Sequence, residues 1–218
     1  MSFVVGLPAL LVGVLCCSGA PPPATGPLLP PPQPGALRTV SDFSMIRDAD
    51  ERAGALFLEA SRVILHPRCS NCHPNGDTPL QGDEGFLHEP PVPRGPENNG
   101  VVGMECTGCH QSQNLELARV PGAPSWHLAP RSMAWVGKSP RAICEQLKDP
   151  ARNGDKTLAE IAEHTAHDGL VAWGWAPGHG RTTPPGDQAS FGALVAAWVE
   201  AGAACPEQEA VVVAEETR

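Results

Sequence analysis

CSNCH (residues 69–73) and CTGCH (residues 106–110) are two copies of one pattern, C-x-x-C-H, and the second begins 37 residues after the first. The two thiols of each copy lie one helical turn apart, and a histidine follows directly. This arrangement is typical of covalent haem attachment, in which both thiols react with the vinyl groups of one haem and the imidazole ligates its iron. The sequence therefore predicts two covalently bound haem c groups. The attaching thiols would be Cys69, Cys72, Cys106 and Cys109, and the proximal iron ligands His73 and His110.

Zinc binding is the alternative interpretation of the same cysteines. Two C-x-x-C pairs can hold one zinc ion as four thiolates. Such a site needs no histidine after either pair, and it is typical of a reducing cytosol. The compartment therefore separates the two interpretations.

The composition predicts a loop-rich chain with a thin protein core. Of 218 residues, 23 are glycine and 25 are proline, aromatic residues make up 5%, and there is no tyrosine. Two buried haems would add the apolar volume that the side chains lack. We therefore expect a mainly α fold with extensive irregular loops and no substantial sheet, a dihaem cytochrome c domain.

The net charge of −9 bears on the partners. The chain has no basic stripe that could neutralise phosphates, which argues against nucleic-acid binding. A basic docking partner is the more natural expectation.

The N-terminus is typical of an export signal. Residues 3–15 form an apolar run that is short for a membrane span, and it ends at Cys16 and Cys17. One of these cysteines is a candidate for lipidation after cleavage; the alternative is cleavage after Ala20. We expect residues 1–20 to be a leader and the mature protein to lie in the periplasm of a Gram-negative bacterium, where a lipid on Cys16 or Cys17, if one is added, would be its only membrane contact.

Three further segments follow the leader. Residues 21–40 are rich in proline and predict an extended tether. Residues 41–206 are the expected haem domain, and residues 207–218 an acidic, disordered tail.

Within the domain, apolar spacing predicts a helix at residues 48–65 with an aspartate cap. Ser139 and Pro140 open another helix that ends before Pro150, and Thr157 with Glu160 forms a capping box for a third. The last helix runs from the Asp187 cap to Gly202. Residues 74–103 are expected to be loop.

Two cysteines, Cys144 and Cys205, remain once the leader and the two motifs are accounted for. An oxidising compartment favours a disulfide between them. The alternative is two separate buried thiols that act as small apolar side chains.

The distal iron ligands are less clearly indicated. His88 lies between the motifs with enough chain to reach either haem, and His127 lies in an apolar loop where an unpartnered imidazole would be costly. A structural, hydrogen-bonded role for His127 stays open. His167 and His179 are expected to face solvent. The reserve candidates for distal ligation are Met133, His66 and His164.

Residues 64–206 resemble the small dihaem cytochromes associated with isoquinoline 1-oxidoreductase-like molybdenum hydroxylases. The resemblance implies an electron-transfer protein that accepts electrons from such a dehydrogenase and passes them to a downstream acceptor. It implies haem attachment at the two motifs and leaves the distal ligands open. The stretches that carry it are HPRCSNCHPNGDTPLQGD (66–83), MECTGCHQSQN (104–114), PGAPSWHLAPRSMAW (121–135), GKSPRAICEQLKDPARNG (137–154), LVAWGW (170–175) and AWVEAGAACP (197–206).

An enzyme is the main competing function. A dihaem peroxidase would need an open iron site with acid–base groups around bound peroxide. Such peroxidases are longer, and their two motifs lie farther apart. The sequence therefore favours an electron carrier over a catalyst.

Overall fold

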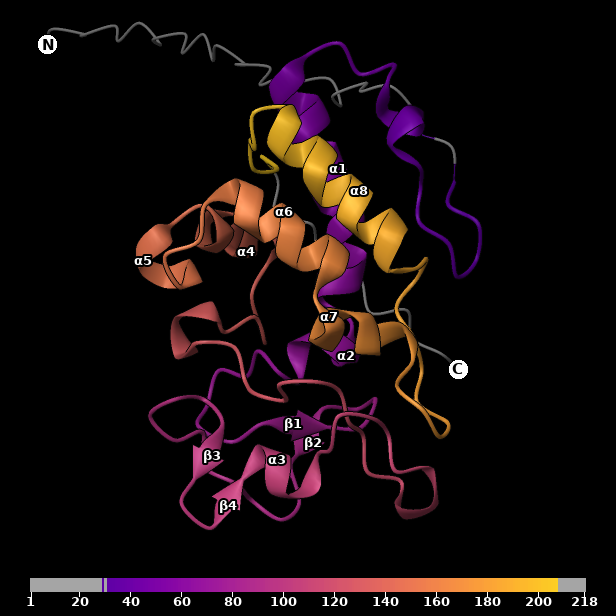
Figure 1. Cartoon of the computed structure of the whole chain (residues 1–218). Helices are drawn as coiled ribbons and strands as arrows, with labels where there is room; N and C mark the ends of the chain where they lie inside the picture. Colours follow the sequence, from indigo (N-terminus) through magenta and orange to yellow (C-terminus); the bar gives the residue numbers. More distant parts are fainter. Residues whose placement is uncertain (1–28, 30, 208–218) are drawn as a thin grey trace, which may run out of the picture.

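Helices dominate the part of the chain that this computed structural model describes, which is residue 29 and residues 31–207 (Figure 1). The longer helices are α1 (Ala49–Ile64), α4 (Pro140–Leu147), α6 (Leu158–His167) and α8 (Gln188–Glu200). The shorter ones are α2 (Pro67–Ser70), α3 (Cys106–Cys109), α5 (Pro150–Asn153) and α7 (Gly169–Ala172), with 3-10 turns η1 (Val40–Phe43), η2 (Glu116–Ala118), η3 (Arg131–Met133) and η4 (Trp173–Trp175). The prediction of a mainly α fold is confirmed.

The helix starts follow the caps in the sequence. The Asp48 carboxylate accepts the N–H groups of Asp50 and Glu51 at the start of α1. Thr157 and Glu160 cap each other's backbone at the start of α6, as the capping-box pattern predicts. These bonds satisfy backbone N–H groups that have no partner inside the helix. The α4 and α8 caps at Ser139 and Asp187 are confirmed in the same way.

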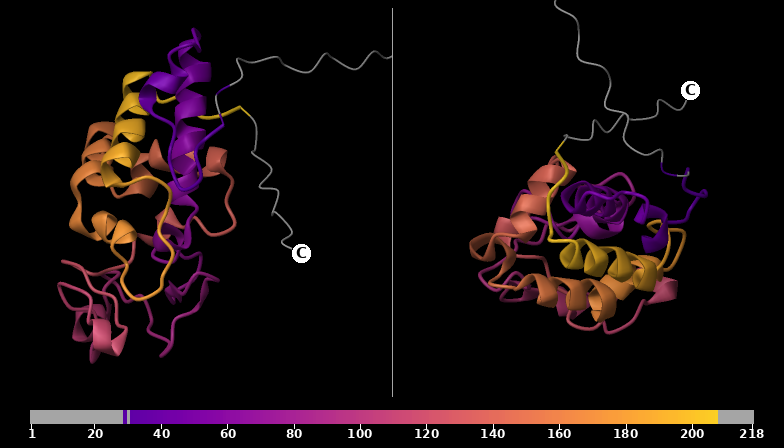
Figure 2. Two further views of the ribbon diagram at one scale, coloured as in Figure 1. Left: turned by 90° about the vertical axis from the view of Figure 1, so that its right-hand side faces the viewer. Right: turned by 90° about the horizontal axis from the view of Figure 1, so that it is seen from above.

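The hydrophobic core lies where α8 packs against both α1 and α6, with α4 against α1 (Figures 1 and 2). Phe57 of α1 and Trp198 of α8 meet at its centre with ring centres 5.0 Å apart, and both are fully buried. Burying a side chain of this size contributes about 1.5–3 kcal/mol. Most of the remaining core comes from Leu56, Val63, Ile64, Ile143, Leu194 and Val195.

Cys144 and Cys205 form a disulfide, with their Cα atoms 5.7 Å apart. Cys144 lies on α4, and Cys205 follows the end of α8. The bond ties the chain beyond α8 to the helix that packs beside α1. This is the pairing that the cysteine count predicts.

A loop-rich part extends beyond the helices, below them in Figure 1 and again apart from them in Figure 2. It holds both motifs and two short antiparallel hairpins, β1 (Leu80–Gln81) with β2 (Phe86–Leu87) and β3 (Gly100–Val101) with β4 (Met104–Glu105). The expectation of unbroken loop over residues 74–103 was therefore wrong in detail. Gly100 explains one hairpin, since its φ of +98° suits glycine and any Cβ there would lie 2.3 Å from the Met104 carbonyl oxygen. Sheet is otherwise absent from the described residues apart from one isolated bridge.

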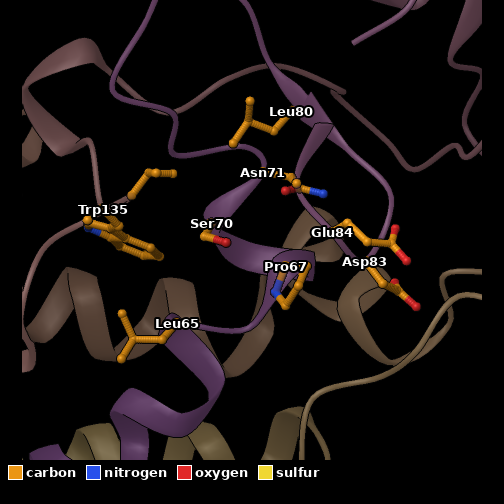
Figure 3. Close-up of a pocket in the computed structure, with 11 residues that line it drawn as sticks. Leu65, Pro67, Ser70, Asn71, Leu80, Asp83, Glu84 and Trp135 are labelled. Atoms are coloured by element: carbon orange, nitrogen blue, oxygen red, sulfur yellow. The ribbon is translucent and has the colours of Figure 1, made fainter. Parts of the chain in front are cut away.

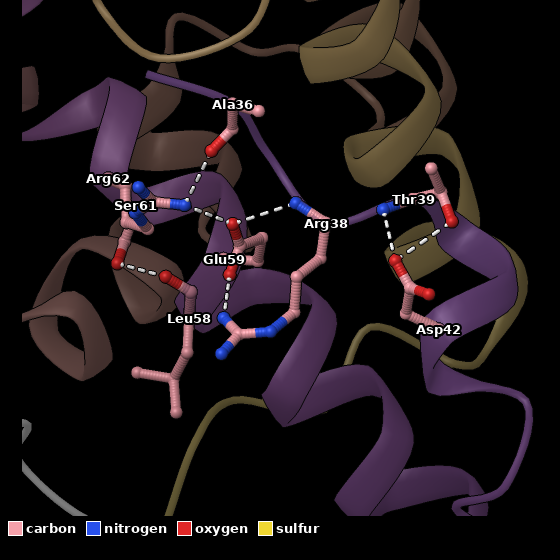
Figure 4. Close-up of polar contacts among 8 residues, drawn as sticks. All are labelled: Ala36, Arg38, Thr39, Asp42, Leu58, Glu59, Ser61 and Arg62. Atoms are coloured by element: carbon pink, nitrogen blue, oxygen red, sulfur yellow. Dashed lines mark hydrogen bonds and ion pairs between the residues drawn. The ribbon is translucent and has the colours of Figure 1, made fainter. Parts of the chain in front are cut away.

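The chain packs onto the domain before residue 41, which corrects the expected end of the tether. Glu59 is buried in α1, and its carboxylate accepts from the backbone N–H of Arg38 and from the Arg38 and Arg62 guanidiniums (Figure 4). Arg62 also donates to the Ala36 carbonyl. A buried carboxylate requires such partners, so residues 36–38 are held against α1.

The leader with Cys16 and Cys17, most of residues 21–30 and the tail from residue 208 lie outside the described residues. Among the helices that are described, none has the length and hydropathy needed to cross a bilayer.

Candidate functional site

The first motif lies directly after α1, because Pro67 cannot continue that helix and instead opens α2 at its first position. His66 caps α2 by accepting the Arg68 N–H on Nδ1. Cys69 packs against the edge of the hydrophobic core, and Cys72 lines a cavity. Burial raises the pKa of the Cys69 thiol to about 12, and the charge of a Cys72 thiolate adds to this shift. Burial also raises the pKa of Cys72 to about 11, so both thiols are protonated at neutral pH.

His73 is held by a bond and a ring contact from one segment. Its Nδ1 lies 2.7 Å from the backbone oxygen of Met133, and its ring stacks on Trp135 with centres 3.3 Å apart and planes 5° apart. Because a carbonyl oxygen can only accept, the proton lies on Nδ1 and the lone pair on Nε2. Burial lowers the pKa of His73 to about 3, against the opposing effect of the Met133 carbonyl. The imidazole is therefore neutral at physiological pH, and its Nε2 carries no proton.

His110 in the second motif repeats this arrangement. Its Nδ1 lies 2.7 Å from the Pro121 oxygen, and its ring stacks on Trp126 at 4.5 Å with an 8° angle. Burial lowers the pKa of His110, with the Pro121 carbonyl opposing it and His88 adding to it. Both motif histidines thus have the same tautomer and a parallel tryptophan.

One segment, residues 121–135, makes these contacts to both histidines. It is fixed to the first motif by backbone bonds from Ala129 to the Cys72 oxygen (3.1 Å) and from Trp135 to the His73 oxygen (2.9 Å). The sequence predicted no role for the two tryptophans of this stretch. Their presence in an irregular, apolar segment was the available signal.

A cavity of about 790 Å³ opens beside both motifs. This volume is within the usual range for small-molecule and cofactor sites. Thiols from both motifs reach it, together with the second motif's histidine and a largely apolar wall. Its lining includes the thiols, imidazoles and guanidiniums of Cys72, Cys106, Cys109, His88, His110, His127, Arg68 and Arg181.

His88 and His127, the two favoured distal candidates, both line this cavity. The Nδ1 of His88 lies 2.7 Å from the Pro90 oxygen, and that of His127 lies 2.5 Å from the Ser125 oxygen. Each therefore carries its proton on Nδ1 and leaves Nε2 available, like the motif histidines. His127 is more exposed than its apolar sequence neighbours predict.

The three reserve candidates differ in whether a ligand atom is left available. Met133 is buried in the hydrophobic core, and His66 accepts a backbone N–H on Nδ1, so its neutral ring has the proton on Nε2. His164 pairs its Nδ1 with the Asp168 carboxylate at 3.3 Å, which leaves Nε2 available. It also lies close enough to His73 to lower that group's pKa, as does His127. His167 and His179 are exposed, as expected.

A second, smaller pocket of about 270 Å³ also lies against the first motif (Figure 3). Leu65, Pro67 and Ser70 form one wall and Trp135 faces them, with Asp83 at the rim. Trp135 thus lines this pocket and also stacks on His73.

The four motif thiols are not gathered round one point. Over residue 29 and residues 31–207, the structure contains no group of three or more His, Cys, Asp or Glu side chains placed to hold a single metal ion. Comparison of the chain with protein-family models, curated proteins and solved structures found no match.

Proposed function

We propose that this protein is a dihaem c-type cytochrome that transfers electrons in the periplasm. Cys69 and Cys72 would attach one haem and Cys106 and Cys109 the other. A molybdenum hydroxylase-like dehydrogenase is the proposed donor, and a downstream respiratory protein the acceptor. Bound haem supplies reversible one-electron chemistry at iron.

The observation that carries the proposal is that His73 and His110 have the same tautomer, held by the same two kinds of contact. Iron-ligating histidines characteristically donate their second ring N–H to a backbone carbonyl or carboxylate, which fixes the tautomer and orients the ring. Both motif histidines do so, to Met133 and Pro121, and each is braced by a tryptophan. A zinc site made of four thiolates would place no such demand on either imidazole.

The larger cavity has a lining that suits haem. It receives thiols from both motifs, its wall is largely apolar, and it contains cationic side chains suited to haem carboxylates. Thiols from both motifs on one cavity also favour two haems that are close together, as electron transfer between them requires.

For distal ligation we propose His88 and His127. The ring centres of His88 and His110 are 5.8 Å apart. Metal–imidazole bonds are about 2 Å long, so the ring centres of two imidazoles on opposite sides of one metal ion are roughly 6 Å apart. This agreement favours His88 as the partner of His110. His127 would then serve with His73, and His164 is its rival.

The test is expression with the c-type maturation machinery, followed by intact mass and metal analysis. Two added haems and no zinc are expected, and Cys106→Ala/Cys109→Ala should retain one haem. Zinc, or no haem, would overturn the proposal. The peroxidase alternative predicts rapid carbon monoxide binding by the ferrous wild-type protein, whereas two six-coordinate irons should bind it slowly.

A further inference from the structure

Arg68 is a buried cation whose hydrogen bonding is incomplete. Only 5% of the residue is exposed. Its Nη2 donates to the Gly82 oxygen and pairs with the Asp83 carboxylate. Its Nε is buried without a hydrogen-bond partner. An unpartnered donor on a buried charged group destabilises the fold, so a missing partner is indicated.

Arg181 lies on the loop that leads from η4 to α8, and it lines the same cavity as Arg68. It donates to the backbone oxygens of Pro177, Gly178 and Arg119. No carboxylate in the described part of the chain lies within ion-pair distance of it. Its charge is therefore not neutralised by a protein carboxylate.

The two guanidiniums are close enough to repel each other. Burial lowers the pKa of Arg68, Asp83 opposes that effect, and Arg181 adds to it. Asp83 is engaged elsewhere as well, since it accepts the Thr182 N–H at 3.2 Å. Two cations thus line the cavity, and only Arg68 is paired with a carboxylate, in a protein whose net charge is −9.

The chemistry of the missing group follows from these donors. A guanidinium presents several N–H groups in a planar fork that matches the two oxygens of a carboxylate. The cavity is otherwise largely apolar and lies against the motif thiols. The expected ligand is therefore an apolar molecule that carries a carboxylate.

We propose that Arg68 and Arg181 bind a propionate carboxylate of a haem in this cavity, an inference that rests on the dihaem function above. The carboxylate gives Arg68 Nε a partner and supplies the counter-charge that Arg181 lacks. The two residues are positioning residues, because they hold the haem edge and do not touch the iron. Their positive charge also disfavours the ferric state, which carries one charge more than the ferrous state.

The test uses the haem-loaded protein with Arg181→Gln, Arg68→Gln and a control, Arg131→Gln. Arg131 is exposed, pairs with Asp77 and does not line the cavity. Loss of a cation beside one haem should lower the midpoint potential of that haem in both cavity variants, and the control should change little. Arg181→Lys, which keeps the charge, should recover most of the shift. The propionate bending band in resonance Raman spectra should move in the cavity variants alone.

The outcomes separate this inference from the proposed function. Intact mass shows first whether two haems are attached; if none is, both proposals are overturned. If both haems are attached and Arg181→Gln behaves like Arg131→Gln, only the propionate assignment is wrong. A wild-type potential that varies with phosphate concentration at constant ionic strength, with the dependence lost in Arg181→Gln, would assign the site to a free anion. Arg181 is the primary variant, since it is half-exposed and its loss leaves the Arg68–Asp83 pair intact.

Discussion

The imidazole of His88 lies beside that of His110, with ring centres 5.8 Å apart and planes at 59°. Residues 88 and 110 belong to different loops, and the Nδ1 of His88 bonds to the Pro90 oxygen. If the two rings ligate one iron, His88→Ala should turn one haem high-spin and open it to carbon monoxide. His167→Ala is the matched control, because His167 is an exposed histidine on α6. Equal spectra for the two variants would remove His88 from the ligand set.

The second distal ligand can be assigned by three single variants. His127→Ala should make the other haem high-spin, while His164→Ala and Met133→Leu should leave both low-spin spectra unchanged. Met133 packs in the core, so exchange for leucine should cost less than ~1.5 kcal/mol. A high-spin haem in His164→Ala alone would transfer the assignment to His164, whose Nε2 is also available.

The Cys144–Cys205 disulfide closes a long loop, with a sequence separation of 61. Cys144→Ala/Cys205→Ala should lower the free energy of unfolding by about 4 kcal/mol on the chain-entropy estimate. Urea denaturation under oxidising conditions measures the change. Recovery of both residues as free thiols in non-reduced wild-type peptides would contradict the bond itself.

Glu59 should make stability depend on acid pH. Its burial raises the pKa of the carboxyl, but the bonds from the Arg38 backbone and from the Arg62 and Arg38 guanidiniums lower it below 4.5 overall. A depressed carboxyl pKa stabilises the fold above the unfolded value and loses that contribution as the pH falls through the folded value. Glu59→Gln should therefore cost about 2 kcal/mol at pH 7, and the difference from wild type should shrink below pH 4.5.

Unfolding free energies measured between pH 3 and pH 7 test this dependence. Glu145→Gln is the control, since the Glu145 side chain forms an exposed pair with Arg141 that should contribute less than ~1 kcal/mol. A difference between wild type and Glu59→Gln that stays constant over this range would contradict the prediction.

Gly192 allows α8 to pack closely against α6. A Cβ at this position would lie 2.7 Å from both the Cα and the Cβ of Ala166, so the helices would have to move apart. Gly192→Ala should destabilise the fold by about 1–3 kcal/mol, as overpacking does. Gly76→Ala, where a Cβ meets nothing within 4 Å, should change stability little. Thermal unfolding of the two variants compares them directly.

Local signals in the sequence were sufficient for the four longer helices, α1, α4, α6 and α8, but not for the short helices α2, α5 and α7. Asp48, Ser139, Thr157 and Asp187 each cap a helix where the pattern predicts one, because a cap bonds to backbone only two or three residues away. The cysteine count likewise indicated the Cys144–Cys205 pair by elimination. The hairpins between residues 80 and 105 were missed, since strands of two residues carry no measurable alternation.

The sequence by itself determined the chemistry of the candidate site, because C-x-x-C-H places two thiols and an imidazole within five residues of chain. Only the tertiary structure decided how those groups are held. Trp126 and Trp135 stack on histidines 16 and 62 residues before them, and Arg181 reaches a cavity that Arg68 lines from the first motif. Contacts over such separations depend on how the loops pack, and no local pattern encodes that packing. The tautomers of His88 and His127 were likewise decided by carbonyl groups whose direction follows from the folded backbone.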